Sequence, residues 1–388
     1  MINVLFDIPN DTGWIAGLNY FLNLFNALNS LPERRINPII LGSTDNLPIP
    51  LKGNSFIPRY SPPSPSVKNI RHVRNRLEYR FTGHIRDYDR YLRHHKIDLL
   101  SHMAIPSRPT NVPVLAWIPD FQHRHLPHYF SQEEINKRCL RQAQAAENAQ
   151  GILLSSDDAR NDFNEFHPGY EHKTHILRFV AAPCAAEKLP IAELVLNKYN
   201  IREPFFHVPN QLWAHKNHGV ILEALCILRQ RGHCPLVIST GKTDDYRNAE
   251  FFPNFFQRVK DLDMDERFRF LGFIDYGEVS VIMRESVALI NPSLFEGWST
   301  IVEEAKSLGK RTLLSSIAVH CEQAYERSNF FEPLNAEQLA LLMEETLNSY
   351  DPCQEAIAME MATHELPNRM RQFGRKYEAI VCSVLGRH

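Results

Sequence analysis

The chain has 388 residues, of which 44% are hydrophobic and 23% charged, a composition typical of a globular protein with room for two domains. The formal net charge of -2 argues against a general nucleic-acid-binding protein. Seven dispersed cysteines without a Cys-x-x-Cys pair predict reduced thiols in a cytoplasmic protein, and neither a secretory signal nor a run of 18 apolar residues is visible.

The first half of the chain alternates short apolar runs with amphipathic segments. A loop containing Gly13 and Gly17 follows the first apolar run. Two interpretations stay open: the loop faces a ligand, or its glycines serve only a tight turn. Residues 45–66 are rich in proline and serine and are predicted to be loop. The predicted strands are 2–8, 38–41, 97–101, 112–118, 151–155 and 174–180, and the predicted helices are 18–31 and 131–148.

Residues 68–96 form a basic stretch in which leucines and tyrosines are interleaved. It has nine lysines and arginines against three acidic residues. One interpretation is a patch that attracts anionic lipid head groups, which would bring the protein to the periphery of a membrane. The other is a solvated helix face.

Asp120, His123 and His125 follow the predicted strand 112–118. Ligands bind at the carboxyl ends of parallel strands, so these side chains are well placed for chemistry.

No metal site is predicted from the sequence. His123, His125 and His128 lack the acidic ligand or helical spacing of a typical zinc site. The Asp-x-Asp runs within residues 87–89 and 261–265 are interpreted as solvated surface.

The second half of the chain repeats the alternation after the proline-containing segment 181–203. Strands and helices that alternate in both halves predict two doubly wound α/β domains, at residues 1–185 and 204–367, with a linker at 186–203. A ligand is then expected in the cleft between the domains. The predicted strands are 205–208, 236–239, 268–273, 286–290 and 312–314. One predicted helix ends near residue 231, and the others are 277–284, 300–309, 335–348 and 368–385.

The stretch from Ile290 to Gly309 reads as a strand end, a tight loop and a short helix. Thr300, followed three residues later by Glu303, is a capping-box pattern that predicts the helix start. The first turn of a helix attracts anions. Glu296 and Glu304 flank this site, and carboxylates bind hydroxyls rather than phosphates. Together these features suggest a nucleotide-sugar ligand.

The segment Pro292-Ser-Leu-Phe-Glu-Gly-Trp-Ser-Thr-Ile-Val-Glu-Glu-Ala, with glutamates eight residues apart, resembles the signature of retaining glycosyltransferases of family four. The glycine loop, the Pro-Asp-Phe-Gln-His segment, Leu212-Trp-Ala-His-Lys-Asn-His and Leu271-Gly-Phe follow in the family's order, so the resemblance covers nearly the whole chain. It implies the GT-B fold, an α/β architecture with two Rossmann-like domains. It also implies that residues 368–388 form a helix that packs back on the first domain.

The resemblance implies roles for individual residues. Glu304 is expected to bond the ribose, and Glu296 to hold the donor sugar or support the reacting centre. Lys216 matches the lysine that contacts the diphosphate, while Gln211 stands where the family usually has an arginine. The group that completes transfer is expected in the Asp120, His123 and His125 segment. The remaining donor-site residues implied are Gly17, Gln211, Phe273, Gly297, Trp298, Ser299, Thr300 and Ile301.

The function implied is transfer of a mannose- or glucose-type hexose from a GDP- or UDP-sugar to a glycan or lipid-linked acceptor. The anomeric configuration is retained, without a metal or another cofactor, in the assembly of bacterial polysaccharide or lipopolysaccharide. The expected location is the cytoplasm or the inner face of the plasma membrane. The alternatives are a nucleotide-sugar epimerase of the same fold and a non-catalytic nucleotide-binding subunit.

Overall fold

The computed structural model describes residues 1–8, 15–42, 55–60, 73–74, 77, 86–102, 110–245 and 247–387. The chain folds into two compact units. Unit 1 comprises Met1–Phe121, Glu133–Phe179 and Arg369–His388, and unit 2 comprises Gln122–Gln132 and Val180–Asn368. The division differs from the predicted boundaries mainly in the short segment Gln122–Gln132, which lies in unit 2.

Unit 1 is built on a parallel seven-stranded sheet. The first strand is central, with Val4 paired to Pro38 on one side and to Leu99 on the other. Its residues are buried on both faces, as expected for parallel strands covered by helices. In sheet order the strands are β3 (Ser55–Ile57), β2 (Ile36–Leu41), β1 (Ile2–Phe6), β4 (Leu99–Ser101), β5 (Val114–Trp117), β6 (Gly151–Leu154) and β7 (Thr174–Ile176).

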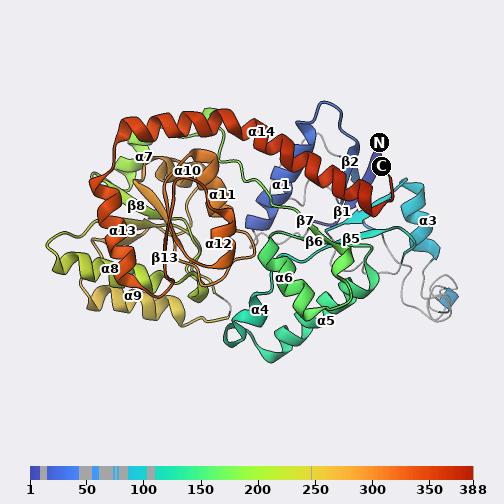
Figure 1. Ribbon diagram of the computed structural model, residues 1–388, viewed down its shortest axis with the longest axis horizontal. Coiled ribbons are helices and arrows are strands. Elements are labelled where there is room, and N and C mark those ends of the chain that lie inside the picture. The colour runs from blue at the N-terminus through green and yellow to red at the C-terminus, as the bar shows by residue number, and fades with distance from the viewer. Residues whose placement is uncertain are drawn as a thin grey trace. The chain divides into compact units, whose positions relative to one another are not determined.

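Helices cover both faces of this sheet (Figure 1). On one face Leu5, Ile152 and Phe163 belong to a core cluster that includes residues of α3, α5 and α6. On the other face Phe6 packs edge-on against Phe25 of α1, with 4.9 Å between ring centroids. The helices are α1 (Ile15–Asn29), α3 (Arg86–His94), α5 (Gln132–Asn148), α6 (Asp157–Phe166) and the short η3 (Glu171–Lys173).

Unit 2 is built on a parallel six-stranded sheet. Four of its strands, β8, β9, β11 and β12, are short runs that are buried along their length, and the sequence pattern located them; β13, which is partly exposed, was not predicted. In sheet order they are β10 (Phe268–Phe270), β9 (Leu236–Ser239), β8 (Phe205–Val208), β11 (Ala288–Asn291), β12 (Thr312–Ser315) and β13 (Ser328–Phe331).

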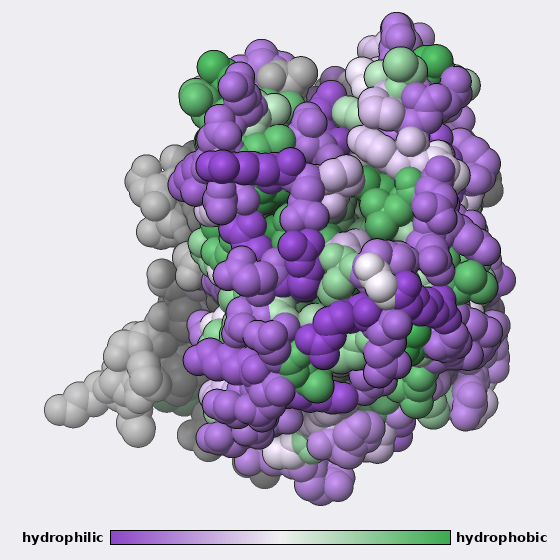
Figure 2. Space-filling view, turned by 90° about the vertical axis from the view of Figure 1, so that its left-hand side faces the viewer, coloured by the Kyte–Doolittle hydropathy of each residue, from purple (hydrophilic) through white to green (hydrophobic). Residues whose placement is uncertain are grey.

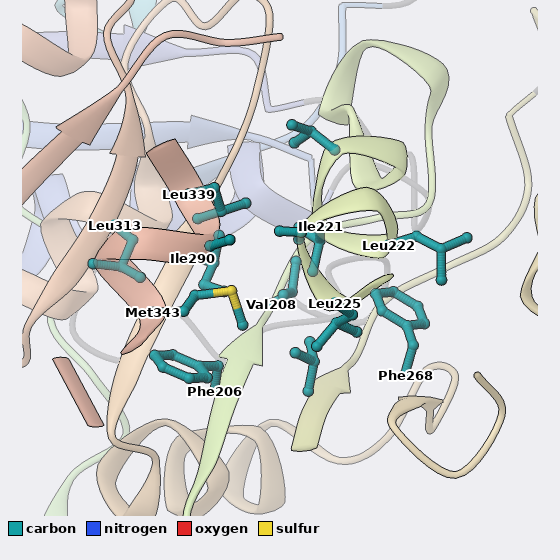
Figure 3. Packing of buried hydrophobic residues seen from close by; sticks show 14 of the residues in the cluster. Phe206, Val208, Ile221, Leu222, Leu225, Phe268, Ile290, Leu313, Leu339 and Met343 are labelled. Atoms are coloured by element: carbon teal, nitrogen blue, oxygen red, sulfur yellow. The ribbon is translucent and has the colours of Figure 1, made fainter. Parts of the chain in front are cut away.

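Alternate residues of these strands serve two different cores. Phe206 and Ile290 pack with Met343 in a large cluster formed with α8, α9 and α13, part of which Figure 3 shows. Phe205 and Leu289 point to the other face, toward α7, α10 and α11. The helices are α4 (Gln122–His125), η2 (Pro127–Tyr129), η4 (Ala186–Lys188), α7 (Ala192–Lys198), η5 (Ala214–Lys216), α8 (His218–Gln230), α9 (Phe251–Asp261), α10 (Tyr276–Glu285), α11 (Thr300–Leu308), α12 (Ala318–Gln323) and α13 (Ala336–Asn348).

Several elements differ from the sequence prediction. The last helix, α14 (Pro352–Val384), starts 16 residues before the predicted position 368, and Pro367 lies inside it. Pro352 is compatible with the first turn of a helix. The predicted loop 45–66 contains β3. The predicted linker 186–203 contains η4 and α7, and Val195 of α7 is buried against β8 and α10.

The glycine loop and the basic stretch are described only in part. Gly13, Lys68, Arg71, Arg76 and Arg80 lie outside the described residues. In the described part, α3 buries Tyr88 and Leu92 in the core of unit 1. The carboxylate of Asp87 accepts hydrogen bonds from Arg74 at 2.8 Å and Arg90 at 3.0 Å. This part is therefore an amphipathic helix packed on the sheet.

Among the described residues, no helix is long and apolar enough to cross a membrane. Hydrophilic residues dominate the face shown in Figure 2, and hydrophobic residues form separate groups on it.

Candidate functional site

Asn291, the last residue of β11, ties together two loops at the carboxyl edge of the unit 2 sheet. Its side chain is fully buried. Asn210, in the loop after β8, donates a hydrogen bond to Asn291 Oδ1 at 3.1 Å. Asn291 Nδ2 in turn donates to Ser299 Oγ, at the start of α11, at 2.8 Å. This edge is where ligands bind to open parallel sheets.

Lys216 and Glu296 form an ion pair across these two loops. Lys216 Nζ lies 2.5 Å from Glu296 Oε1, and the side chains are 15% and 12% exposed. Ser293 Oγ donates to the same glutamate oxygen at 2.7 Å. Burial opposes ionisation of Glu296. The positive charge of Lys216, the nearby His320 and the hydrogen bonds from Lys216 and Ser293 favour ionisation, and together they leave the pKa of Glu296 below its usual value. The two residues predicted to act on diphosphate and sugar therefore lie together, each neutralising the other.

The capping-box pattern predicted that Thr300 caps the start of α11, but the capping residue is Ser299. Ser299 Oγ accepts a hydrogen bond from Val302 N at 3.4 Å, and Thr300 is the first helical residue. Glu303 accepts from Gln323 Nε2 at 3.3 Å instead of completing a capping box.

Gln323 also determines which backbone amides this helix start can offer. Its Oε1 accepts from Ser299 N at 2.8 Å, so the Ser299 amide is already occupied. The amides of Thr300 and Ile301 belong to the first turn, where an α-helix supplies no acceptor of its own. Gly297 precedes them, and Trp298 is 9% exposed. This first turn remains a suitable place for an anion.

Glu304 lies on α11 and is almost completely buried, with 6% of its surface exposed. Tyr276, the first residue of α10, donates a hydrogen bond from its hydroxyl to Glu304 Oε1 at 2.7 Å. Burial raises the pKa of Glu304 to about 7, and the tyrosine hydrogen bond partly opposes that rise. Nothing in the sequence pattern had indicated Tyr276 as a partner of this glutamate.

His123 and His125 belong to unit 2, whereas Asp120 belongs to unit 1. The His125 ring is exposed and stacks on Phe295, directly before Glu296, with 5.2 Å between ring centroids. His123 is 1% exposed and lies beside the ring of Phe130. His125 is thus the histidine that the structure places next to the Glu296 loop.

Arg247 is a second residue that sequence reasoning missed. Its side chain is only 4% exposed and forms an ion pair with Asp245 at 2.9 Å. It donates to Gln122 Oε1 at 2.8 Å, and its guanidinium lies over the rings of Trp213 and Phe130. Arg247 therefore joins Gln122–Gln132 to the loop after β8, which also carries Lys216.

Phe273 and Gln211, two of the donor-site residues that the resemblance implies, lie on neighbouring loops of unit 2. Phe273 is 65% exposed, and Lys242 Nζ lies 5.2 Å from the centre of its ring. The carbonyl of Lys242 accepts from Leu212 N at 2.8 Å, so Lys242 lies beside Gln211. Gly241 has φ +152°, and a Cβ there would meet Asn210 O at 2.5 Å, so this close approach requires glycine.

Two buried histidines flank Lys216. Burial, with the nearby positive charges of Lys216 and Arg247, holds the pKa of His215 well below its usual value. Burial lowers the pKa of His218 to about 3. Both rings are therefore neutral at neutral pH. In the described part of the chain, no group of three or more His, Cys, Asp or Glu side chains is arranged to hold a metal ion.

The other predicted residues lie in unit 1. Gly17 is buried in the first turn of α1. Asp120 Oδ1 is 3.9 Å from an Arg138 nitrogen. Arg178, another cation of this unit, forms an ion pair with Asp157.

Residues 196–376 match the model of the family described as Glycosyl transferases group 1. The matched range contains Lys216, Glu296, Glu304, Tyr276 and Arg247 but not the His123 segment. No curated protein sequence matches the chain.

Solved structures of glycosyltransferases have a similar fold over nearly the whole chain. A glycosyltransferase from Rickettsia africae ESF-5 is 17% identical, with a TM-score of 0.66, covering 99% of this chain and 98% of that one. HepE of Anabaena in complex with UDP and glucose is 13% identical, with a TM-score of 0.67, covering 99% and 100%. WaaG, a glycosyltransferase involved in lipopolysaccharide biosynthesis, is 15% identical, with a TM-score of 0.58, covering 98% of each chain.

These likenesses confirm the predicted fold class, an α/β GT-B architecture of two Rossmann-like parallel-sheet domains. The family match itself covers residues 196–376, less than half of the chain.

Proposed function

We propose that this chain is a glycosyltransferase that moves a hexose from a nucleotide diphosphate sugar to a glycan or lipid-linked acceptor. The observation that carries the proposal is the arrangement at the carboxyl edge of the unit 2 sheet. There the Lys216–Glu296 pair, the first turn of α11 and the buried Glu304 are held by two adjoining loops. A cation and free helix amides suit a diphosphate, and carboxylates suit hydroxyls.

The ion pair gives the donor a defined way to bind. A diphosphate carries more negative charge than one carboxylate, so it competes with Glu296 for Lys216. Glu296 is then released to accept hydrogen bonds from the sugar hydroxyls. As the bond from sugar to phosphate breaks, Lys216 and the amides of Thr300 and Ile301 stabilise the charge that develops on the leaving diphosphate.

We further propose that transfer retains the anomeric configuration and needs no metal ion. The leaving diphosphate helps to deprotonate the acceptor on the same face of the sugar, and His125 beside the Glu296 loop is the candidate to assist. A uridine donor is supported by HepE of Anabaena, which was solved with UDP and glucose. A saccharide acceptor of the cell surface, reached from the cytoplasm or the inner membrane face, is supported by WaaG.

The test combines nucleotide binding with product analysis. The purified full-length chain is first screened with UDP, GDP, UDP-glucose and GDP-mannose by thermal shift. The stabilising sugar nucleotide is then incubated with a panel of saccharide and lipid-linked acceptors, and the products are identified by mass spectrometry and NMR. We expect an acceptor extended by one hexose in the configuration of the donor.

The Glu296→Ala variant is the control for the site. It should lose transfer by roughly 100- to 1,000-fold, because the reacting sugar loses a buried polar partner. Transfer by this variant at the wild-type rate would contradict the proposed site. Conversion of the donor sugar without an acceptor would point to an epimerase, and nucleotide binding without any turnover would point to a non-catalytic subunit.

A further inference from the structure

Tyr276 and Glu304 form a hydrogen-bonded pair that the proposed chemistry does not yet use. The tyrosine hydroxyl lies 2.7 Å from Glu304 Oε1. Within the described part of the chain, Tyr276 is the only group that donates a hydrogen bond to this carboxyl. One glutamate oxygen is thus held by the protein, and the other is left for a ligand.

The bond has a fixed direction. Burial and the negative charge of Glu304 raise the pKa of Tyr276 above its usual value. The phenol therefore stays protonated and acts as the hydrogen-bond donor to Glu304. Tyr276 is itself held by the start of α10, where Asp275 caps the helix by accepting from Gly277 N at 2.8 Å. A rigid donor therefore faces a nearly buried carboxylate on the neighbouring helix.

We propose that Tyr276 is a positioning residue for the donor ribose, holding Glu304 in one orientation and favouring its ionised form. The inference rests on the proposed function, in which Glu304 accepts hydrogen bonds from ribose hydroxyls. An ionised carboxylate accepts hydrogen bonds at both oxygens. While Tyr276 occupies Glu304 Oε1, the second carboxylate oxygen is oriented to accept from the ribose. Binding of a sugar nucleotide then favours the ionised glutamate.

The charged and titratable surroundings of the pair are few. Cys184, before α7, and Asp275, the cap of α10, lie near Tyr276, while Glu303 is turned toward Gln323. No described cation forms an ion pair with Glu304. Burial therefore dominates the pKa of Glu304 and raises it to about 7, and the Tyr276 hydrogen bond is the contribution that opposes this rise.

The affinity for the sugar nucleotide should depend on pH. Below pH 7 Glu304 takes up a proton and no longer accepts as a carboxylate, so affinity for the sugar nucleotide should fall as the pH falls through about 7. A hydrogen bond to the charged form lowers a pKa. Removing the tyrosine hydroxyl should therefore move the midpoint of this dependence to higher pH.

The experiment measures the affinity for UDP-glucose and GDP-mannose by calorimetry from pH 5.5 to 9. These sugar diphosphates are diesters without a phosphate proton that titrates near neutrality, so the midpoint reports on the protein. In Tyr276→Phe the midpoint should rise by on the order of 1 pH unit, which corresponds to about fivefold weaker binding at pH 7.

Tyr199→Phe is the matched control. Tyr199 also donates to a glutamate, Glu278 Oε2, at 2.7 Å, but that carboxylate is outside the candidate site. This variant should keep the wild-type midpoint. A second variant, Glu304→Gln, should bind weakly and without a midpoint between pH 5.5 and 9, because the titrating group is gone.

An unchanged midpoint in Tyr276→Phe, an equal shift in Tyr199→Phe, or a retained midpoint in Glu304→Gln would each overturn the inference. If Tyr276→Phe does not fold, the Glu304→Gln profile decides. A wild-type chain that binds no sugar nucleotide at any pH would instead contradict the proposed function itself.

Discussion

The lysine–glutamate pairs Lys310–Glu355 and Lys216–Glu296 lie at opposite edges of the unit 2 sheet, and their surroundings differ. At the amino edge, Lys310 is fully buried and donates to the carbonyls of Arg284 at 3.0 Å and Ser286 at 2.5 Å. Its carboxylate partner, Glu355, is 3.9 Å away. Glu355 also accepts from Arg311 and Arg327. The charges of this cluster are compensated within the protein, and Glu355 Oε2 and Arg327 Nε are buried without a hydrogen-bond partner among the described residues.

At the carboxyl edge the pair is less complete. Among the described residues, Glu296 is the only ion-pair or hydrogen-bond partner of the Lys216 ammonium group. An ammonium group has three donors, so Lys216 retains capacity to bind another anion. Burial lowers the pKa of Lys310 to about 8, which is the behaviour of a group enclosed by protein. The Lys310–Glu355 pair thus stabilises the fold, whereas the Lys216–Glu296 pair is available to a ligand.

Breaking the pair at the amino edge should have the largest effect. Glu355→Ala leaves Lys310, Arg311 and Arg327 without their shared carboxylate, and the free energy of unfolding should fall by about 3–5 kcal/mol. Urea denaturation measures this change. The folded fraction should bind the sugar nucleotide with wild-type affinity. A Glu355→Ala protein as stable as the wild type would show that the Lys310–Glu355 pair does not stabilise the fold.

Breaking the pair at the carboxyl edge should affect activity more than stability. Lys216→Met should slow transfer by roughly 100- to 1,000-fold, since the cation that stabilises the leaving diphosphate is lost. Its unfolding free energy should change by less than about 2 kcal/mol, because Glu296 keeps the hydrogen bond from Ser293 when the lysine is replaced. Lys260→Met, at an exposed lysine of α9, is the control and should leave both quantities unchanged.

Arg247 is a cation at the carboxyl edge whose guanidinium is already bound by protein groups. Arg247→Lys keeps a charge beside Asp245 but loses the planar contacts with Trp213 and Phe130 and the bond to Gln122. Transfer should fall about tenfold as the His125 segment loosens, while donor affinity stays constant. Steady-state kinetics and calorimetry separate the two quantities. An equal loss of donor affinity would show that Arg247 contacts the donor.

Lys242 should give the smallest effect. It lies beside Gln211 and its ammonium contacts only the Phe273 ring among the described residues. Lys242→Ala should weaken sugar-nucleotide binding by roughly two- to fivefold at low salt. The difference should disappear at 1 M salt, where exposed charges are screened. An effect that persists at high salt would indicate a direct contact with the diphosphate.

Sequence periodicity predicted the buried strands well because each is a short apolar run. The prediction for 205–208 coincides with β8. It missed β3, which is three residues long in a proline- and serine-rich segment, β13, which is partly exposed, and the first half of α14, which contains Pro352 and Pro367. The capping residue of α11 was misplaced by one position, because both Ser299 and Thr300 are good capping residues.

Single residues of the site were predictable, but their partnerships were not. Lys216 and Glu296 were each proposed from local pattern, while their ion pair joins positions 80 residues apart. Tyr276 and Arg247 act through bonds that span 28 and 125 residues. The order of motifs contains no signal for such contacts. They follow only from the packing of the two loops and helices at the carboxyl edge.

The most direct test of the account is a crystal structure of the chain with the sugar nucleotide that stabilises it most. We predict that Lys216 Nζ leaves Glu296 for the diphosphate, that Glu296 accepts from the sugar hydroxyls, and that Glu304 accepts from the ribose while Tyr276 stays bound to it. A ligand bound elsewhere, or one that leaves the Lys216–Glu296 bond intact, would contradict the account.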